Sequence, residues 1–182
     1  GFLVALIDAL DSQLHPIDRT KIAAVGYSNG GRMAHRLACD LELAAIVAVS
    51  ASLGSEVVGI CPSDAAPSVM IWHGTYDGVI PFEGKPLSLN GRHISDALST
   101  RDAIIFWAKQ AGCDREPVIE AFYTPPPSAR EVSIQKIAYT CTDKRIEAYV
   151  VEGGGHDWQF TRNISTSEEI WLFLADVFAA PQ

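Results

Sequence analysis

The sequence predicts an α/β fold, in which a mainly parallel sheet carries helices on both of its faces. Two observations lead to this prediction. Short continuous apolar runs, which are typical of strands buried on both sides, alternate along the chain with segments of helical periodicity. The length of 182 residues, with 48% hydrophobic and 20% charged residues, is ordinary for one domain with a sizeable core. We therefore treat residues 1–182 as a single domain.

The expected strands are short and uninterrupted by charge. Three apolar runs predict buried parallel strands: Ile22–Gly26, Ala44–Val49 and Val69–Trp72. The third run breaks at the dipeptide His73-Gly74. Two later runs predict a hairpin, and they are Ile134–Tyr139 and Ile146–Val151.

The expected helices have recognisable ends. Helices are expected over Leu3–Leu14, Gly30–Cys39, Thr100–Ala111 and Thr166–Phe178, and in the first of them apolar residues recur at steps of three and four. The first ends before Pro16, which cannot continue a helix. Ser99 with Asp102 resembles a capping box that opens the third, and Gly112 stops it. Ser165 is the expected N-cap of the last helix.

Charge and motif content exclude several classes of protein. There are 14 Lys and Arg against 22 Asp and Glu, so the net charge is −8, and a polyanion such as a nucleic acid is repelled. No apolar run approaches the roughly 18 residues that cross a bilayer, so we expect no membrane partner. The spacing of Cys and His residues fits no zinc site, and Gly26–Gly31 lacks the features of a phosphate loop. We expect neither a metal nor a cofactor.

The segment Gly26-Tyr27-Ser28-Asn29-Gly30 joins a predicted strand to a predicted helix. Acyl transfer needs a hydroxyl group raised above the sheet on a tight turn, and glycines on both sides leave room for that turn. Ser28 is therefore the candidate nucleophile. The backbone N–H of Asn29, at the start of the helix, is expected to point at the oxyanion of a tetrahedral intermediate.

A nucleophilic serine needs a base, and the base needs a carboxylate that orients it. Asp77 lies just past the third predicted strand, and His156 lies just past the last one. Because sites gather at the carboxyl ends of parallel strands, these two residues are expected beside Ser28. Three other acids compete with Asp77 but follow no strand so directly: Asp64, Asp96 and Asp102.

Other polar and aromatic residues near these segments receive structural interpretations. We expect His73 to satisfy backbone groups near a strand end, and His35 and His93 to lie on the surface or on a helix face. Asp157 is interpreted as a loop-capping residue. Trp158 either lines a substrate cleft or packs against the protein.

Three motifs occur together in this chain. The first is Tyr27–Ala34 followed by Arg36–Cys39, the second is the His-Gly-Thr…Asp…Val/Ile-Pro segment at residues 73–81, and the third is Gly-Gly-Gly-His…Trp at residues 153–158. Together they resemble the secreted bacterial polyhydroxybutyrate depolymerase-like esterases, a group that includes feruloyl and acetyl-xylan esterases. The resemblance covers nearly the whole chain.

This resemblance implies the α/β-hydrolase fold with Ser28 as nucleophile, His156 as base and Asp77 as its partner. It implies an ester substrate derived from plant cell walls or polyesters, and a secreted or periplasmic location. Tyr27 and Trp158 are candidates for contact with that substrate. Residues 157–159 read Asp-Trp-Gln, whereas relatives usually have a small polar residue, Trp and Pro.

Four widely spaced cysteines leave two interpretations open on their count alone. An even number fits two disulfides in an oxidising compartment, and it fits four free thiols in the cytosol equally well. The resemblance implies disulfides, and Cys113 with Cys141 looks like a pair that such proteins commonly carry. We predict this bridge, together with Cys39–Cys61.

The resemblance also leads us to expect that the chain is the C-terminal part of a complete hydrolase, with N-terminal strands missing. In related enzymes the segment resembling Gly1–Leu14 is the helix before the elbow strand, and several strands and a loop with a second oxyanion N–H precede it. Ile22–Val25 is then expected at a sheet edge. Its apolar residues, with no Pro or Lys, favour association at that edge.

These observations predict a cofactor-free serine esterase that acts through an acyl-enzyme. Two alternatives remain open. A serine peptidase of the prolyl-oligopeptidase type shares the elbow and the residue order, and a catalytically silent fragment or binding module could keep the triad without a complete oxyanion hole.

Overall fold

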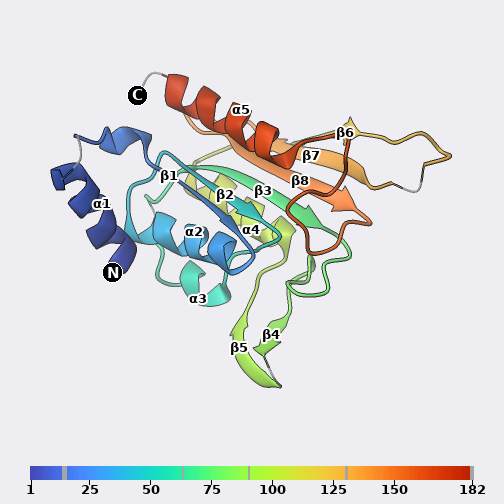
Figure 1. Ribbon diagram of the computed structural model, residues 1–182, viewed down its shortest axis with the longest axis horizontal. Helices are drawn as coiled ribbons and strands as arrows, with labels where there is room; N and C mark the ends of the chain where they lie inside the picture. The colour runs from blue at the N-terminus through green and yellow to red at the C-terminus, as the bar shows by residue number, and fades with distance from the viewer. Residues whose placement is uncertain (14–15, 63, 90, 130, 181–182) are drawn as a thin grey trace.

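A computed structural model describes residues 1–13, 16–62, 64–89, 91–129 and 131–180 (Figure 1). Its strands are β1 (Ala23–Tyr27), β2 (Ala45–Val49), β3 (Ser68–Gly74), β4 (Pro86–Leu89), β5 (Arg92–Asp96), β6 (Val118–Tyr123), β7 (Ser133–Tyr139) and β8 (Ile146–Glu152). Its α-helices are α1 (Phe2–Gln13), α2 (Asn29–Asp40), α3 (Ser55–Val58), α4 (Thr100–Gln110) and α5 (Thr166–Ala179), and a 3₁₀ turn, η1, spans Arg19–Lys21.

A six-stranded mixed sheet in the order β1-β2-β3-β8-β7-β6 forms the centre of the fold. The first four strands are parallel, whereas β7 and β6 join them antiparallel. The α/β class is therefore confirmed, and the sheet is mostly parallel, with one antiparallel part. The β7–β8 hairpin agrees with the sequence, but β6 and the small β4–β5 hairpin have no counterpart among the expected strands.

Helices cover both faces of this sheet (Figure 1). Alternate residues of a strand point to opposite faces, so in β2 Ile46 packs in the cluster that includes Trp107 of α4, while Val47 packs in the cluster that includes Phe173 of α5. Helix α2 joins the first cluster through Ala34. This burial on both sides explains why the central strands read as continuous apolar runs.

The expected caps and ends agree closely with the structure. The Ser99 hydroxyl accepts a hydrogen bond from the N–H of Asp102, and the Ser165 hydroxyl accepts one from Glu168. Strand β3 continues through His73-Gly74 instead of breaking there. Leu14, the expected last apolar residue of the first helix, lies outside the described residues.

Both predicted disulfides are present. Cys39 of α2 bonds to Cys61, just after α3, with a Cα–Cα distance of 4.7 Å. Cys113, just after α4, bonds to Cys141 in the loop between β7 and β8, at 4.2 Å. Two disulfides are typical of a protein from an oxidising compartment outside the cell. No helix among the described residues is long and apolar enough to cross a membrane.

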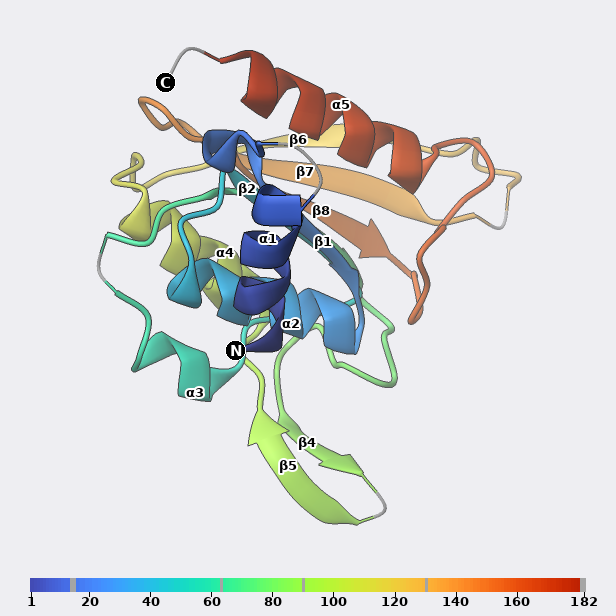
Figure 2. The same ribbon diagram turned by 60° about the vertical axis from the view of Figure 1, so that its left-hand side comes forward.

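Strand β1 lies at the edge of the sheet, where β2 is its partner, as the sequence predicts. Helix α1 lies beside this edge, in front of α2 in Figure 2. No residue of α1 is buried, and an apolar groove of about 430 Å³ runs between α1, β1 and α2. The β1 side of the molecule is therefore open, in contrast to the middle of the sheet.

Candidate active site

Ser28 stands on a tight turn between β1 and α2. Its φ of 55° is uncommon for a residue other than glycine, and such strained residues cluster at functional sites. A Cβ atom at Gly26 would lie 2.1 Å from the carbonyl oxygen of Gly30, so glycine is required at that position. The expected tight strand-to-helix turn is confirmed. The expected need for glycine holds at Gly26 but not at Gly30, where a Cβ atom would meet nothing within 4 Å.

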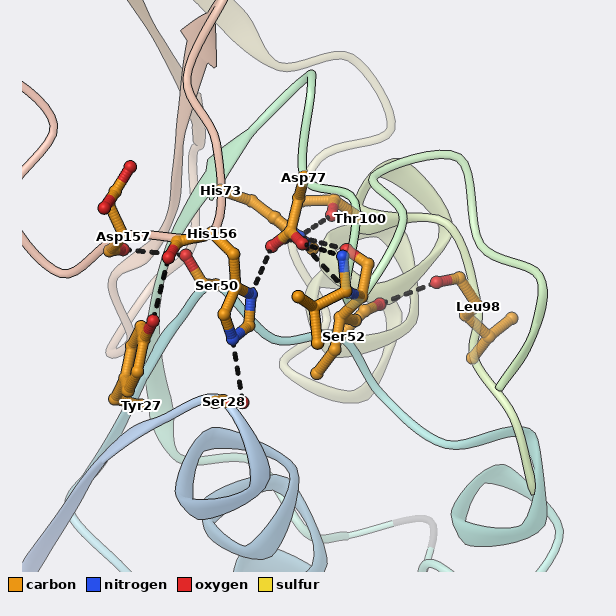
Figure 3. Close-up of polar contacts among 12 residues, drawn as sticks. Tyr27, Ser28, Ser50, Ser52, His73, Asp77, Leu98, Thr100, His156 and Asp157 are labelled. Atoms are coloured by element: carbon orange, nitrogen blue, oxygen red, sulfur yellow. Dashed lines mark hydrogen bonds and ion pairs between the residues drawn. The ribbon is translucent and has the colours of Figure 1, made fainter. Parts of the chain in front are cut away.

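Three side chains form a hydrogen-bonded series at the carboxyl ends of the parallel strands (Figure 3). The Nε2 atom of His156 lies 2.9 Å from the Ser28 Oγ, and its Nδ1 atom lies 2.8 Å from the Asp77 Oδ2. An ionised carboxylate can only accept hydrogen bonds, so the proton of the neutral ring is on Nδ1. The Nε2 atom is then free to accept a hydrogen bond from the Ser28 hydroxyl. The residues expected to meet do meet, and Asp77 rather than the three competing acids bonds to His156.

The Asp77 carboxylate is buried and fully hydrogen-bonded. Its Oδ1 accepts the backbone N–H groups of Val79 and Ile80, each at 2.8 Å, while its Oδ2 faces the rings of His156 and His73. Burial alone would raise the pKa of Asp77, but hydrogen bonds from His73, His156 and the two backbone groups outweigh it and lower the pKa to about 2. The carboxylate therefore stays ionised at neutral pH.

His73 is buried beside this carboxylate and bonds to groups on two sides. Its Nε2 lies 2.8 Å from the Ile80 carbonyl oxygen and 3.2 Å from the Asp77 Oδ2, so Nε2 must carry a proton. Its Nδ1 lies 2.6 Å from the hydroxyl of Thr100, at the start of α4. The expectation that His73 satisfies a backbone group is met, and the sequence reasoning missed its contact with Asp77 and the role of Thr100.

Three further residues lie near the Ser28–His156–Asp77 series, and they are Asn29, Tyr27 and Trp158. Asn29 begins α2, so its N–H belongs to the first turn, where no intrahelical partner exists. The partly exposed ring of Tyr27 lies 5.1 Å from the His156 ring, centroid to centroid, and 6.4 Å from that of Trp158. The indole N–H of Trp158 donates to the Ser167 hydroxyl. Tyr27 thus borders His156, and Trp158 borders Tyr27.

His35 lies on a helix face, which is one of the two places that the sequence led us to expect, but that face is the inner one. It lies on α2 but is fully buried, stacks on Trp107 and accepts the indole N–H through Nδ1 at 3.0 Å. Burial, with smaller effects from the charges of Arg32 and His73, lowers the pKa of His35 to about 3. His93 is exposed, as expected, and pairs with Asp96 on the β4–β5 hairpin.

Within the described residues, no group of three or more His, Cys, Asp or Glu side chains is placed to hold a metal ion. The fold and site thus define an α/β protein with a serine, a histidine and an aspartate in hydrogen-bonded series at the carboxyl edge of its parallel strands.

A search of curated proteins found a distant relative of this chain. The chain is 26% identical over 165 residues to a protein of Nocardia uniformis subsp. tsuyamanensis described as "Putative esterase NocK". The alignment covers 86% of this chain and 47% of the relative, so the chain spans about half the length of the curated protein that it matches. No family model matches the sequence.

Proposed function

We propose that this protein is a serine esterase in which Ser28, His156 and Asp77 act as a catalytic triad. The observation that carries the proposal is the hydrogen-bonded series from the Ser28 hydroxyl through His156 to Asp77, at 2.9 and 2.8 Å. These distances are within the range that proton transfer between a nucleophile and its base requires. The similarity to the protein described as "Putative esterase NocK" supports ester hydrolysis as the reaction.

The reaction would proceed in two halves. As the Ser28 oxygen attacks the ester carbonyl carbon, His156 takes its proton and then passes that proton to the departing alcohol, which leaves an acyl-enzyme. Water then gives a proton to His156 and attacks the acyl carbon, and the acid is released as Ser28 regains its proton. Asp77 keeps Nε2 available as acceptor and stabilises the imidazolium while it exists.

Charge that develops on the carbonyl oxygen needs donors close to Ser28. We propose the Asn29 backbone N–H as one donor, because the N-terminal turn of α2 presents unpaired N–H groups and the positive end of the helix dipole. Each such donor typically accounts for about a hundred- to thousandfold in rate.

We further propose the finer assignment that the resemblance implies: an α/β-hydrolase of the polyhydroxybutyrate depolymerase-like or feruloyl esterase-like group, secreted or periplasmic. The two disulfides are consistent with that location. Tyr27 and Trp158 would contact the substrate, because Tyr27 borders His156 and Trp158 borders Tyr27. A panel of feruloyl, acetyl-xylan and hydroxybutyrate-oligomer esters tests this assignment, and turnover of only one class would identify the substrate.

The activity itself is tested with a fluorophosphonate probe and with short p-nitrophenyl esters. We expect one label per chain, on Ser28, and turnover of the short esters. Hydrolysis of peptide anilides instead of esters would favour the peptidase alternative. A folded sample that neither labels nor turns over esters would contradict the proposal and favour a silent binding module.

A further inference from the structure

His156 and Ser28 come from strands that are not neighbours. His156 follows β8 and Ser28 follows β1, while β3 and β2 lie between these strands in the sheet. Neighbouring strands are about 4.8 Å apart, so three spacings separate β8 from β1 by about 14 Å. The segment Gly153–Asp157 therefore has to cross the ends of two strands before the imidazole can reach the serine.

Backbone groups hold the first part of this crossing segment at the end of β3. The N–H of Gly153 donates to the Thr75 hydroxyl at 3.0 Å, and the N–H of Tyr76 donates to the carbonyl of Gly154 at 2.8 Å. The contact is so close that a Cβ atom at Gly74 would lie 2.2 Å from that same carbonyl oxygen. The segment is thus attached where it passes β3.

Two side-chain hydroxyls hold the rest of the segment at the ends of the next two strands (Figure 3). Ser50, directly after β2, donates to the carbonyl of Asp157 at 2.7 Å. Tyr27, the last residue of β1, donates to the carbonyl of His156 at 2.9 Å. The crossing segment is therefore attached at each of the three strand ends that it reaches.

We propose that Tyr27 and Ser50 are positioning residues for ester hydrolysis, whose hydroxyls fix two successive carbonyls, those of His156 and Asp157, and so hold the imidazole against Ser28. This inference rests on the proposed function. The two bonded carbonyls define the orientation of the backbone immediately after His156, and that orientation sets where the ring lies. Neither residue touches the reacting atoms through these bonds.

The local structure of both residues agrees with this role. Ser50 is completely buried and has a φ of 48°, a conformation that residues other than glycine rarely adopt and that persists where surrounding contacts impose it. Its N–H is already bonded to the carbonyl of Trp72, so only its hydroxyl is free to bind the crossing segment. Burial and the carboxylates of Asp157 and Asp77 raise the pKa of Tyr27, which keeps its phenol protonated as a donor.

The chain provides a matched control for Ser50. Ser52 lies two residues further on, is equally buried, and donates its hydroxyl to the carbonyl of Leu98 at the same distance of 2.7 Å. The carbonyl that Ser52 binds belongs to the segment before α4, whereas Ser50 binds the one next to His156. Both hydrogen bonds are part-buried, and loss of either hydroxyl leaves one carbonyl without its serine donor. A purely structural role therefore predicts a similar effect for both.

The experiment compares Ser50→Ala with Ser52→Ala, using p-nitrophenyl acetate turnover, fluorophosphonate labelling and thermal unfolding. Both variants should lower Tm by similar amounts. Small misplacements of catalytic groups cost up to about a hundredfold, so we expect kcat to fall about tenfold in Ser50→Ala alone, with KM within about twofold of the wild type. Labelling of Ser28 should slow in the same proportion.

Two further variants separate the hydroxyl from the backbone. Ser50→Gly relieves the positive φ but removes the donor, so kcat should fall as in Ser50→Ala even if Tm does not. Tyr27→Phe keeps the ring beside His156 and removes only the phenol, and a loss of about threefold or more in kcat is expected.

The outcomes are distinct. The positioning role would be overturned if the wild type hydrolyses esters and kcat is the same in all four variants, which are Ser50→Ala, Ser50→Gly, Ser52→Ala and Tyr27→Phe. The esterase proposal would then still stand. A wild type that neither labels nor hydrolyses esters would overturn both.

Discussion

The two sides of the site differ sharply in how they are held. The acid and the base follow β3 and β8, strands whose residues are buried almost throughout. The nucleophile follows β1, an edge strand with two exposed positions. Asp77 has donors on both of its oxygens, while α1, which lies beside β1, has no buried residue. The geometry of the site thus depends on a rigid centre meeting a more exposed edge.

This contrast indicates where a single substitution should move the catalytic groups. A group at the centre is held by many neighbours, so replacing one side chain there removes chemistry without moving the backbone. A group at the edge depends on fewer contacts, among which are the hydroxyl bonds that join the His156 segment to β1 and β2. The predictions below test each side, beginning with the largest effect.

Replacement of the nucleophile should have the largest effect. Ser28→Ala is expected to lower kcat for p-nitrophenyl esters by at least about a thousandfold, because the residual rate comes only from binding and oxyanion stabilisation. Circular dichroism and Tm should show an intact fold, since alanine removes only the hydroxyl. Activity above about a thousandth of the wild-type value would show that Ser28 is not the nucleophile.

Asp77→Asn tests the central side, and we expect kcat to fall by about a thousandfold or more because an amide can hold the wrong tautomer of His156. It also changes stability in acid. The pKa of Asp77 is lowered to about 2, so the stability that its charge contributes is present above pH of about 4 and is lost as the pH falls toward about 2.

Urea titrations should therefore show a wild-type advantage over Asp77→Asn in the free energy of unfolding that shrinks between pH of about 5 and about 2. Asp102→Asn, at the start of α4, serves as control for a carboxylate outside the triad. An advantage that stays constant over this range would contradict the lowered pKa of Asp77.

Much of the arrangement can be predicted because it is encoded locally. The elbow at Ser28 requires glycine at particular positions, and the apolar runs place Asp77 and His156 at strand ends. The caps at Ser99 and Ser165 depend on residues three positions apart, so they too are visible in the sequence.

The contacts that cross the sheet could not be predicted in the same way. The bond from Ser50 to Asp157 spans 107 residues and depends on strand order, which short-range periodicity does not contain. The burial of His35 was missed for a related reason: the periodicity places it on α2, but only the packing of Trp107 from α4 shows that its face is the inner one. Strand β6 carries a charge and is largely exposed, so it lacks the apolar signature of the others.

The two disulfides can be compared in the same way, because one lies on the nucleophile side of the site and the other on the side of the acid and the base. Cys39–Cys61 closes 22 residues and is attached to α2, the helix that follows Ser28, while Cys113–Cys141 closes 28 residues before β8. The chain-entropy model gives each about 3–4 kcal/mol. The double variants Cys39→Ala/Cys61→Ala and Cys113→Ala/Cys141→Ala should therefore lose similar free energies of unfolding, and a loss below about 1 kcal/mol in either would contradict that model.

Burial of His35 inside α2 should make the stability of the protein depend on pH. Its pKa falls to about 3 in the folded protein against about 6.5 for free imidazole, so the unfolded chain binds a proton first. The free energy of unfolding should decline as the pH drops from about 6.5 toward about 3. His35→Asn keeps an acceptor for the Trp107 indole but does not titrate, so it should weaken this decline, whereas the same change at exposed His93 should not.

The smallest effect is expected at the sheet edges, which differ in charge. β1 has no charged residue and faces an apolar groove, while β6, at the opposite edge, contains Glu120. Unpaired strand edges favour association unless charge opposes it, so we expect weak self-association through β1. Val25→Lys should shift sedimentation at high concentration toward the monomer, and Ile119→Lys on β6, a residue that is also exposed, should not. If both substitutions reduce self-association equally, general surface charge controls association, and the β1 edge does not associate more strongly than the β6 edge.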